Sequence, residues 1–290
     1  MKKAPKKRTN DRVELLTPSQ RRWVRLTSAV LPGWTAERAE RLLLRPPRTR
    51  GRAAEVLDAW GERAELSVDG HAIALWHFGP ADAPRALMVH GWGGYGGQFS
   101  AWVKPLLAAG MAVTLFDLPG HGESGGRAGR VDEFMRVIEA LLEALPGTVA
   151  LAAHSMGGAA AIQVLRAERR LKRVVIVAAP ASLAHHVQCL SERVGLGQAA
   201  HRHLVGRLEA GHRPVAELDA MEGLPTDTAR ALFVHDREDA EVDFAHLARF
   251  GQLWPGSEVM ATDGFGHYRV LRATPVVARG TAFLAEAPGA

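Results

Sequence analysis

The sequence predicts an α/β fold with a mostly parallel central sheet and helices on both faces. From about residue 63 onward, short apolar runs bounded by Gly, Pro or His alternate with longer helix-like segments. Continuous apolar runs are typical of strands buried on both faces, as in a parallel sheet. Their alternation with helices indicates repeated strand–helix–strand units.

The first two expected strands form a hairpin, and helices separate the later ones. Residues 65–68 and 72–78 flank Asp69-Gly70, a pair that favours a two-residue hairpin turn. The remaining strand-like runs are residues 85–90, 112–118, 148–154, 173–178, 231–235 and 259–261. The helix-like segments are residues 99–109, 131–145, 157–170 and 244–253.

Residues 181–228 interrupt this alternation, because about 48 positions pass without a strand-like run. We expect this insertion to form a small helical lid that contributes to a substrate pocket. Five histidines lie in it: His185, His186, His201, His203 and His212. They lack the paired cysteine or carboxylate pattern of a metal site, so we predict no metal.

The N-terminal part of the chain is strongly basic. Residues 1–52 hold 15 Lys and Arg against 4 Asp and Glu, a net charge of +11, whereas the remainder carries −6. No nucleic-acid-binding motif accompanies this charge, so we expect no nucleic-acid partner. The arm could also contact a membrane surface, but we favour the interpretation that it is simply solvated.

A helix is expected within this basic region. Trp23, Val24, Leu26, Val30 and Leu31 fall near helical spacing, which suggests an apolar face docked on the body of the protein. Residues 1–62 are therefore expected to form a basic arm with docking helices, and residues 63–290 the α/β domain.

The composition excludes several classes of protein. A single cysteine, Cys189, allows no internal disulfide, and no apolar run approaches the roughly 20 residues that span a bilayer. The apolar stretch after the first dozen residues is broken by Arg25 and Pro32, which makes a poor secretory signal. We therefore expect a cytoplasmic location.

A candidate nucleophile follows the third parallel strand, in A-H-S-M-G-G at residues 153–158. A serine on a sharp strand-to-helix turn projects its oxygen above the sheet, and the small neighbours let strand and helix approach. The start of the helix favours negative charge on a developing oxyanion. A helix N-cap serine is the alternative interpretation of Ser155.

Two further motifs precede the serine. H-G-W-G-G at residues 90–94 follows the first parallel strand, and F-D-L-P-G-H-G-E-S at 116–124 follows the next. With A-H-S-M-G-G they resemble, in the right order, the oxyanion loop, D-x-x-G-x-G-x-S turn and nucleophile elbow of the α/β-hydrolase family. Ala153 replaces the first glycine of the family's G-x-S-x-G pattern. The resemblance covers about residues 63–285 and implies an α/β-hydrolase fold.

Site residues follow from this resemblance position by position. The backbone N–H groups of Trp92 and Met156 would form the oxyanion hole. The D-x-x-G-x-G-x-S turn is structural in the family, so we expect Asp117, His121 and Ser124 to have no catalytic role.

The family's chain order of serine, acid and histidine selects the other two residues. His267 lies in a glycine-rich loop after the last apolar run, whereas His246 falls inside a helix-like segment. Four carboxylates crowd the preceding loop, and the family's position selects Asp239 from Asp236, Glu238, Asp239 and Glu241. We therefore expect conservative replacement of the other three acids to be mild.

A serine at the elbow points to acyl transfer. The sequence predicts a serine hydrolase that cleaves a carboxylic ester through an acyl-enzyme, without a cofactor. A thioesterase or lipase with the same triad, and a noncatalytic binding protein of this fold, are the alternatives. The natural substrate and the oligomeric state stay open.

Overall fold

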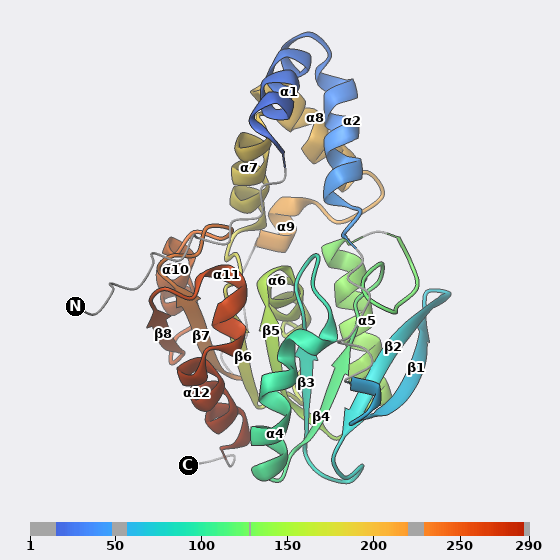
Figure 1. Cartoon of the computed structure of the whole chain (residues 1–290), viewed down its shortest axis with the longest axis vertical. Helices are drawn as coiled ribbons and strands as arrows, with labels where there is room; N and C mark the ends of the chain where they lie inside the picture. The colour runs from blue at the N-terminus through green and yellow to red at the C-terminus, as the bar shows by residue number, and fades with distance from the viewer. Residues whose placement is uncertain (1–15, 48–56, 128, 220–228, 287–290) are drawn as a thin grey trace, which may run out of the picture.

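The computed structural model describes residues 16–47, 57–127, 129–219 and 229–286. One sheet of eight strands crosses the molecule in the order β1-β2-β4-β3-β5-β6-β7-β8 (Figure 1). The hairpin β1–β2 and the pair β2–β4 are antiparallel, and the other neighbours are parallel. The predicted fold class, α/β with a mostly parallel sheet, is therefore confirmed.

The strands lie close to their expected positions. They are β1 (Glu62–Val68), β2 (His71–Phe78), β3 (Arg85–Val89), β4 (Ala112–Phe116), β5 (Thr148–His154), β6 (Arg173–Val177), β7 (Arg230–Asp236) and β8 (Glu258–Thr262). β3, β4 and β6 are buried along their whole length, as continuous apolar runs predict.

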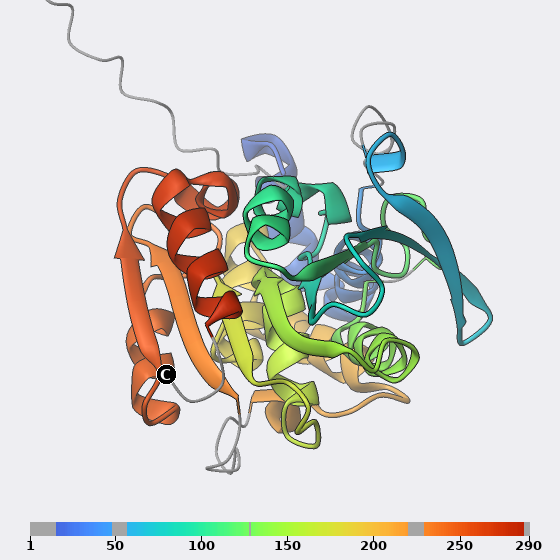
Figure 2. The same cartoon turned by 90° about the horizontal axis from the view of Figure 1, so that it is seen from below.

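Helices cover both faces of the sheet, and each face has its own hydrophobic core (Figure 2). One core is built with α5 (Val131–Ala144), α6 (Ser155–Val164) and α10 (Ala245–Leu253). The other is built with α4 (Ser100–Ala108) and α12 (Thr274–Ala285), a helix that the sequence patterns did not predict. Short helical turns η1 (Gly96–Phe99), α11 (Gly266–Arg269) and η2 (Val270–Arg272) complete the loops.

The insertion forms helices above the end of the sheet where the parallel strands finish (Figure 1). They are α7 (Leu183–Val194), α8 (Gln198–Glu209) and α9 (Val215–Asp219), and no strand lies among the described residues of the insertion. Residues 220–228 of the predicted lid lie outside the described residues. So do residues 1–15 and 48–56 of the predicted arm.

Two N-terminal helices, α1 (Pro18–Val30) and α2 (Pro32–Leu43), pack against α8 of the insertion (Figure 1). A small core joins them, in which Ala36, Val194 and Leu204 are buried. Ser28 Oγ accepts a hydrogen bond of 2.7 Å from Gly197 N, which ties α1 to the start of α8.

Of the five side chains predicted to dock α1, only Val24 packs against the rest of the protein. Trp23, Leu26, Val30 and Leu31 are 49%, 70%, 77% and 54% exposed, and the face through Val24 and Ser28 packs instead. Helical spacing does not show what lies opposite each side of α1, and the lid lies opposite Val24 and Ser28. No helix in the described ranges is long and apolar enough to cross a bilayer.

Candidate active site

The candidate nucleophile, Ser155, stands at the junction of β5 and α6. Its φ of +52° is a left-handed conformation that a residue with a Cβ rarely adopts. The close approach of neighbouring chains explains the small residues of the motif. A Cβ on Gly157 would lie 2.1 Å from His90 O, and one on Gly91 would lie 2.8 Å from Ser155 Cβ. The turn therefore aims the serine oxygen away from the strand, as an elbow requires.

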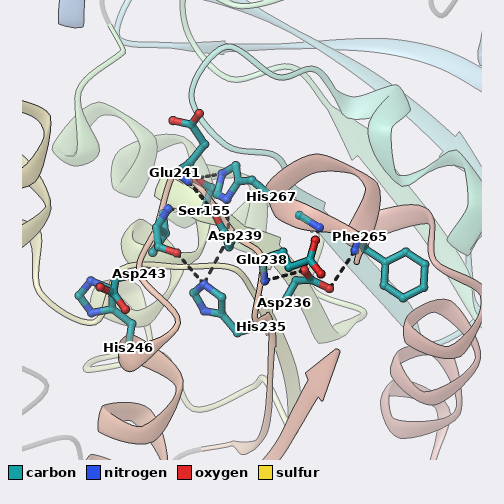
Figure 3. A network of polar contacts seen from close by, with 12 residues as sticks. Ser155, His235, Asp236, Glu238, Asp239, Glu241, Asp243, His246, Phe265 and His267 are labelled. Atoms are coloured by element: carbon teal, nitrogen blue, oxygen red, sulfur yellow. Dashed lines mark hydrogen bonds and ion pairs between the residues drawn. The ribbon is translucent and has the colours of Figure 1, made fainter. Parts of the chain in front are cut away.

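His267 and Asp239 meet this serine from two other loops (Figure 3). Ser155 Oγ lies 3.0 Å from His267 Nε2, and His267 Nδ1 donates to Asp239 Oδ2 over 2.7 Å. His267 is the second residue of the short helix α11 after β8, where sequence patterns indicated a loop. The structure thus brings together the three residues that motif order selected, while His246 is buried and accepts from Ala181 N.

The carboxylate of Asp239 is held by donors on both oxygens. Oδ1 accepts from the backbone N–H groups of Glu241 and Val242, and His235 Nε2 lies 3.3 Å from Oδ2 beside His267. Burial alone would raise the pKa of Asp239, but the hydrogen bonds from His235 and His267 outweigh it and hold the pKa well below its usual range. The side chain is therefore ionised and fixed toward the imidazole.

His154, which precedes the serine, supports the candidate histidine. Its Nε2 donates to the backbone oxygen of His267 over 2.9 Å, and the two rings lie 4.7 Å apart. Burial, followed by the charge of His267, lowers the pKa of His154 to about 3. His154 is therefore a neutral, buried imidazole that packs directly against His267.

Asp236 is a site residue that the sequence patterns left without a role, and its replacement was expected to be mild. Its carboxylate is fully buried and accepts from the backbone N–H groups of Phe265 and Gly266, directly before His267. Thr262 Oγ1 and Glu238 N also donate to it. These bonds tie the end of β7 to the turn that carries His267 (Figure 3). The only local hint was a carboxylate directly after a buried apolar run.

The loop after β3 supplies the candidate oxyanion hole. Gly93 N donates to His121 Nε2 and Gly94 N to Gly91 O, so these two amides are engaged. The N–H groups of Trp92 and Met156 donate to no acceptor in the described part of the chain. Both residues border the cavity above Ser155. The two amides that the resemblance implied are therefore available to a bound oxyanion.

The D-x-x-G-x-G-x-S turn braces this loop from behind. Asp117 accepts from Gly96 N and Glu123 N, and Ser124 Oγ donates to Asp117 O. Burial lowers the pKa of His90 to about 4, so its neutral ring accepts from Leu118 N. These residues contact backbone groups rather than the cavity, which agrees with a structural role.

A largely apolar cavity of about 180 Å³ extends from Ser155 to the lid and to α2. Its walls include leucines and valines of α7, α8 and α9, together with Leu42, Leu43 and Leu44. His186 also faces the cavity, and burial lowers its pKa to about 3. The leucine run at the end of α2 was visible in the sequence, but its place in the cavity was not.

The other lid histidines have separate local contacts. His201 Nδ1 lies 2.9 Å from Ser191 Oγ, and His212 Nδ1 lies 2.6 Å from Asp132 Oδ2. Among the described residues, no group of three or more His, Cys, Asp or Glu side chains could hold a metal ion. His212 borders the cavity, and the contact of His201 with Ser191 joins α8 to α7.

A family model described as "Serine aminopeptidase, S33" matches residues 82–227. A dihydrolipoyllysine-residue acetyltransferase component of the acetoin cleaving system of Pseudomonas putida is 33% identical over 156 residues, 51% of this chain and 38% of that protein. A pimeloyl-[acyl-carrier protein] methyl ester esterase of Nitrosomonas europaea is 33% identical over 98 residues, 33% of this chain and 38% of that protein. The chain thus spans about two fifths of the length of these curated relatives.

A solved structure shares the fold. An esterase of Pyrococcus furiosus matches with a TM-score of 0.62 and 20% identity, over 83% of this chain and 97% of that one. Because the identity is low, the match shows only that the two proteins share an arrangement of strands and helices. It extends beyond the segment matched by the family model, since it covers most of both chains.

Proposed function

Because the chain belongs to the serine aminopeptidase S33 family, within the α/β-hydrolase superfamily, we propose that it is a serine hydrolase that cleaves a carboxylic ester through an acyl-enzyme. One observation carries this proposal: Ser155 Oγ, in its left-handed turn, lies 3.0 Å from the imidazole of His267. The ester preference draws support from relatives described as methyl ester esterases.

In the proposed acylation, Ser155 Oγ attacks the carbonyl carbon and passes its proton to His267 Nε2. Asp239 holds the other ring nitrogen and stabilises the imidazolium that forms. The developing oxyanion faces the backbone N–H groups of Trp92 and Met156. Collapse of this intermediate breaks the bond to the alcohol oxygen, which takes the proton from His267.

Deacylation repeats the same steps with water. His267 accepts a proton from a water molecule, whose oxygen attacks the acyl carbonyl carbon. The bond to Ser155 Oγ then breaks, the serine regains its proton from His267, and a carboxylic acid leaves. All the groups in this cycle belong to the chain, so the proposal includes no cofactor.

The cavity suggests the kind of ester. Its walls include many leucine and valine side chains of the lid and of α2, which favour an apolar acyl or alcohol group. A thioester with the same acyl group would fit the same walls, so ester and thioester substrates need direct comparison. The single cysteine and the absence of a disulfide keep the cytoplasm as the proposed location.

Labelling with a fluorophosphonate probe tests the proposed nucleophile directly. The wild type and a Ser67→Ala control, altered on an exposed edge strand, should both be labelled. Ser155→Ala should not be labelled and should lose hydrolysis of p-nitrophenyl esters. An unlabelled wild type with no turnover on any acyl chain length would support the noncatalytic alternative instead.

A further inference from the structure

Exposed apolar side chains run along the hairpin of α1 and α2. We call Trp23, Leu26, Val30, Leu31 and Trp34 the apolar ridge. Eight large hydrophobic side chains are exposed in the described part of the chain, and six of them lie between residues 23 and 42. Single exposed hydrophobic residues are normal on a protein surface, but a cluster of them indicates an interaction surface.

The apolar ridge is ordered. Trp23, Leu26 and Val30 stand on one side of α1 at intervals of three and four residues. The ring centroids of Trp23 and Trp34 lie 5.4 Å apart in an edge-to-face pair that joins the two helices. Thr17 and Gln20 form a capping box at the start of α1. A partner would therefore meet a preformed surface.

Exposed arginines lie on the same two helices as the apolar ridge. Residues 16–47 contain six arginines and two glutamates, a net charge of +4. Both glutamates are already paired: Glu37 with Arg41, and Glu40 with Arg130 and Arg207. The arginines are all exposed: Arg21, Arg22, Arg25, Arg38, Arg41 and Arg45. The surface thus combines apolar side chains with an excess of positive charge.

We propose that the α1–α2 hairpin docks the protein onto an anionic lipid bilayer. Tryptophan, leucine and valine side chains enter the boundary between headgroups and acyl chains, while guanidinium groups bind lipid phosphates. Arg38 lies 4.3 Å from the ring centre of Trp34, so one side chain of each kind is placed together. Figure 1 shows the hairpin at the end of the molecule remote from the sheet, where a flat surface can reach it.

Charge decides against two other partners. A second copy of the chain would bring its own arginines against this surface, which costs like-charge repulsion. A nucleic acid would satisfy the arginines but would leave the apolar ridge in contact with a charged backbone. A bilayer that contains anionic lipid satisfies both kinds of side chain.

The second helix of the hairpin, α2, also reaches the cavity. Leu42, Leu43 and Leu44, at the end of α2, line the space above Ser155. This extension rests on the proposed function: an ester that resides in the bilayer would approach the cavity along α2. Docking itself does not depend on the reaction, so it can be measured with Ser155→Ala.

Vesicle sedimentation tests the docking. Full-length wild type and Ser155→Ala are mixed with vesicles of phosphatidylcholine alone, or of phosphatidylcholine mixed with the anionic lipid phosphatidylglycerol. Both proteins should sediment with the anionic vesicles, and high salt should reduce binding because it screens the arginines. Pure phosphatidylcholine should retain far less protein.

Variants separate the two contributions. Trp23→Ser with Leu26→Ser should lower the partition coefficient on anionic vesicles by about tenfold or more, since it removes the apolar contact. Arg22→Gln with Arg25→Gln should lower it and weaken its salt dependence. Val259→Ser, which alters an exposed valine on β8, is the matched control and should bind like the wild type.

Three results would overturn the proposal. The first is wild-type protein that stays in the supernatant with anionic vesicles. The second is unchanged binding of the Trp23→Ser, Leu26→Ser variant, above all if changing Lys2, Lys3 and Lys6 to Gln removes binding instead. The third is a wild type that light scattering shows to be an oligomer, together with a Trp23→Ser, Leu26→Ser variant that is a monomer but still binds vesicles. That result would assign the apolar ridge to self-association.

Discussion

Replacing Asp236 with Asn tests whether a residue outside the proposed triad controls the position of His267. Oδ1 of Asp236 accepts from Glu238 N and Gly266 N, and Oδ2 accepts from Thr262 Oγ1 and Phe265 N. The hydrogen bonds outweigh burial and lower the pKa of this carboxyl, so the native group is ionised. An asparagine must place its NH2 group where one of these oxygens accepts.

The better orientation of the asparagine directs NH2 toward Thr262, whose hydroxyl can accept, and away from Gly266. In this orientation the NH2 group still faces the N–H of Phe265, so two donors oppose each other. The remaining hydrogen bonds are also weaker, because the asparagine side chain carries no charge. A hydrogen bond to a buried charged group contributes about 1.5–3 kcal/mol, so we expect a loss of about 3 kcal/mol of unfolding free energy. A shift of about 1 Å in His267 would lower kcat by about a hundredfold.

The assay measures kcat, KM and thermal unfolding on one p-nitrophenyl ester. Asp236→Asn should lower Tm by roughly 8 °C, since 1 kcal/mol corresponds to about 2–4 °C in a domain of this size. It should lower kcat with a smaller change in KM. Asp263→Asn is the control, because Asp263 lies in the same loop but is exposed. If Asp236→Asn matched this control in both kcat and Tm, the inferred support of His267 would be refuted.

Three further predictions follow from the site. Asp239→Asn should lower kcat by about ten-thousandfold with little change in KM, because the wrong tautomer of His267 then faces Ser155. Burial holds the folded-state pKa of His90, His154 and His186 at about 3–4. Stability should therefore be full above pH 6.5 and fall by about 2 kcal/mol per histidine at pH 5, measured by urea unfolding. Leu208→Trp, in the cavity wall, should shift the preferred p-nitrophenyl ester to a shorter acyl chain without abolishing fluorophosphonate labelling.

The sheet and the elbow could be predicted from the sequence because their signals are local. Continuous apolar runs mark strands buried on both faces, and β3, β4 and β6 are such strands. The glycines around Ser155 are required by contacts that any strand–turn–helix of this kind makes. The order of the motifs then selected His267 and Asp239, whose catalytic roles stay predictions.

Asp236 could not be assigned in this way, because its partners are distant in sequence. Three of its four donors lie 26 to 30 residues away, on β8 and the turn that follows. A pattern within β7 cannot report them, since only the pairing of β7 with β8 brings the two segments together. From the sequence alone, Asp236 was therefore interpreted as an ordinary loop carboxylate.

The sequence by itself determined the fold class, the positions of the strands along the chain and the three side chains that meet at the elbow. Tertiary structure alone decided which face of α1 is buried. Helical periodicity identifies apolar faces but does not say what lies opposite each one. Because α8 is packed against the side of Val24 and Ser28, Trp23 and Leu26 are left at the surface. The same packing sets Leu42–Leu44 over the cavity, a contact between segments more than 100 residues apart.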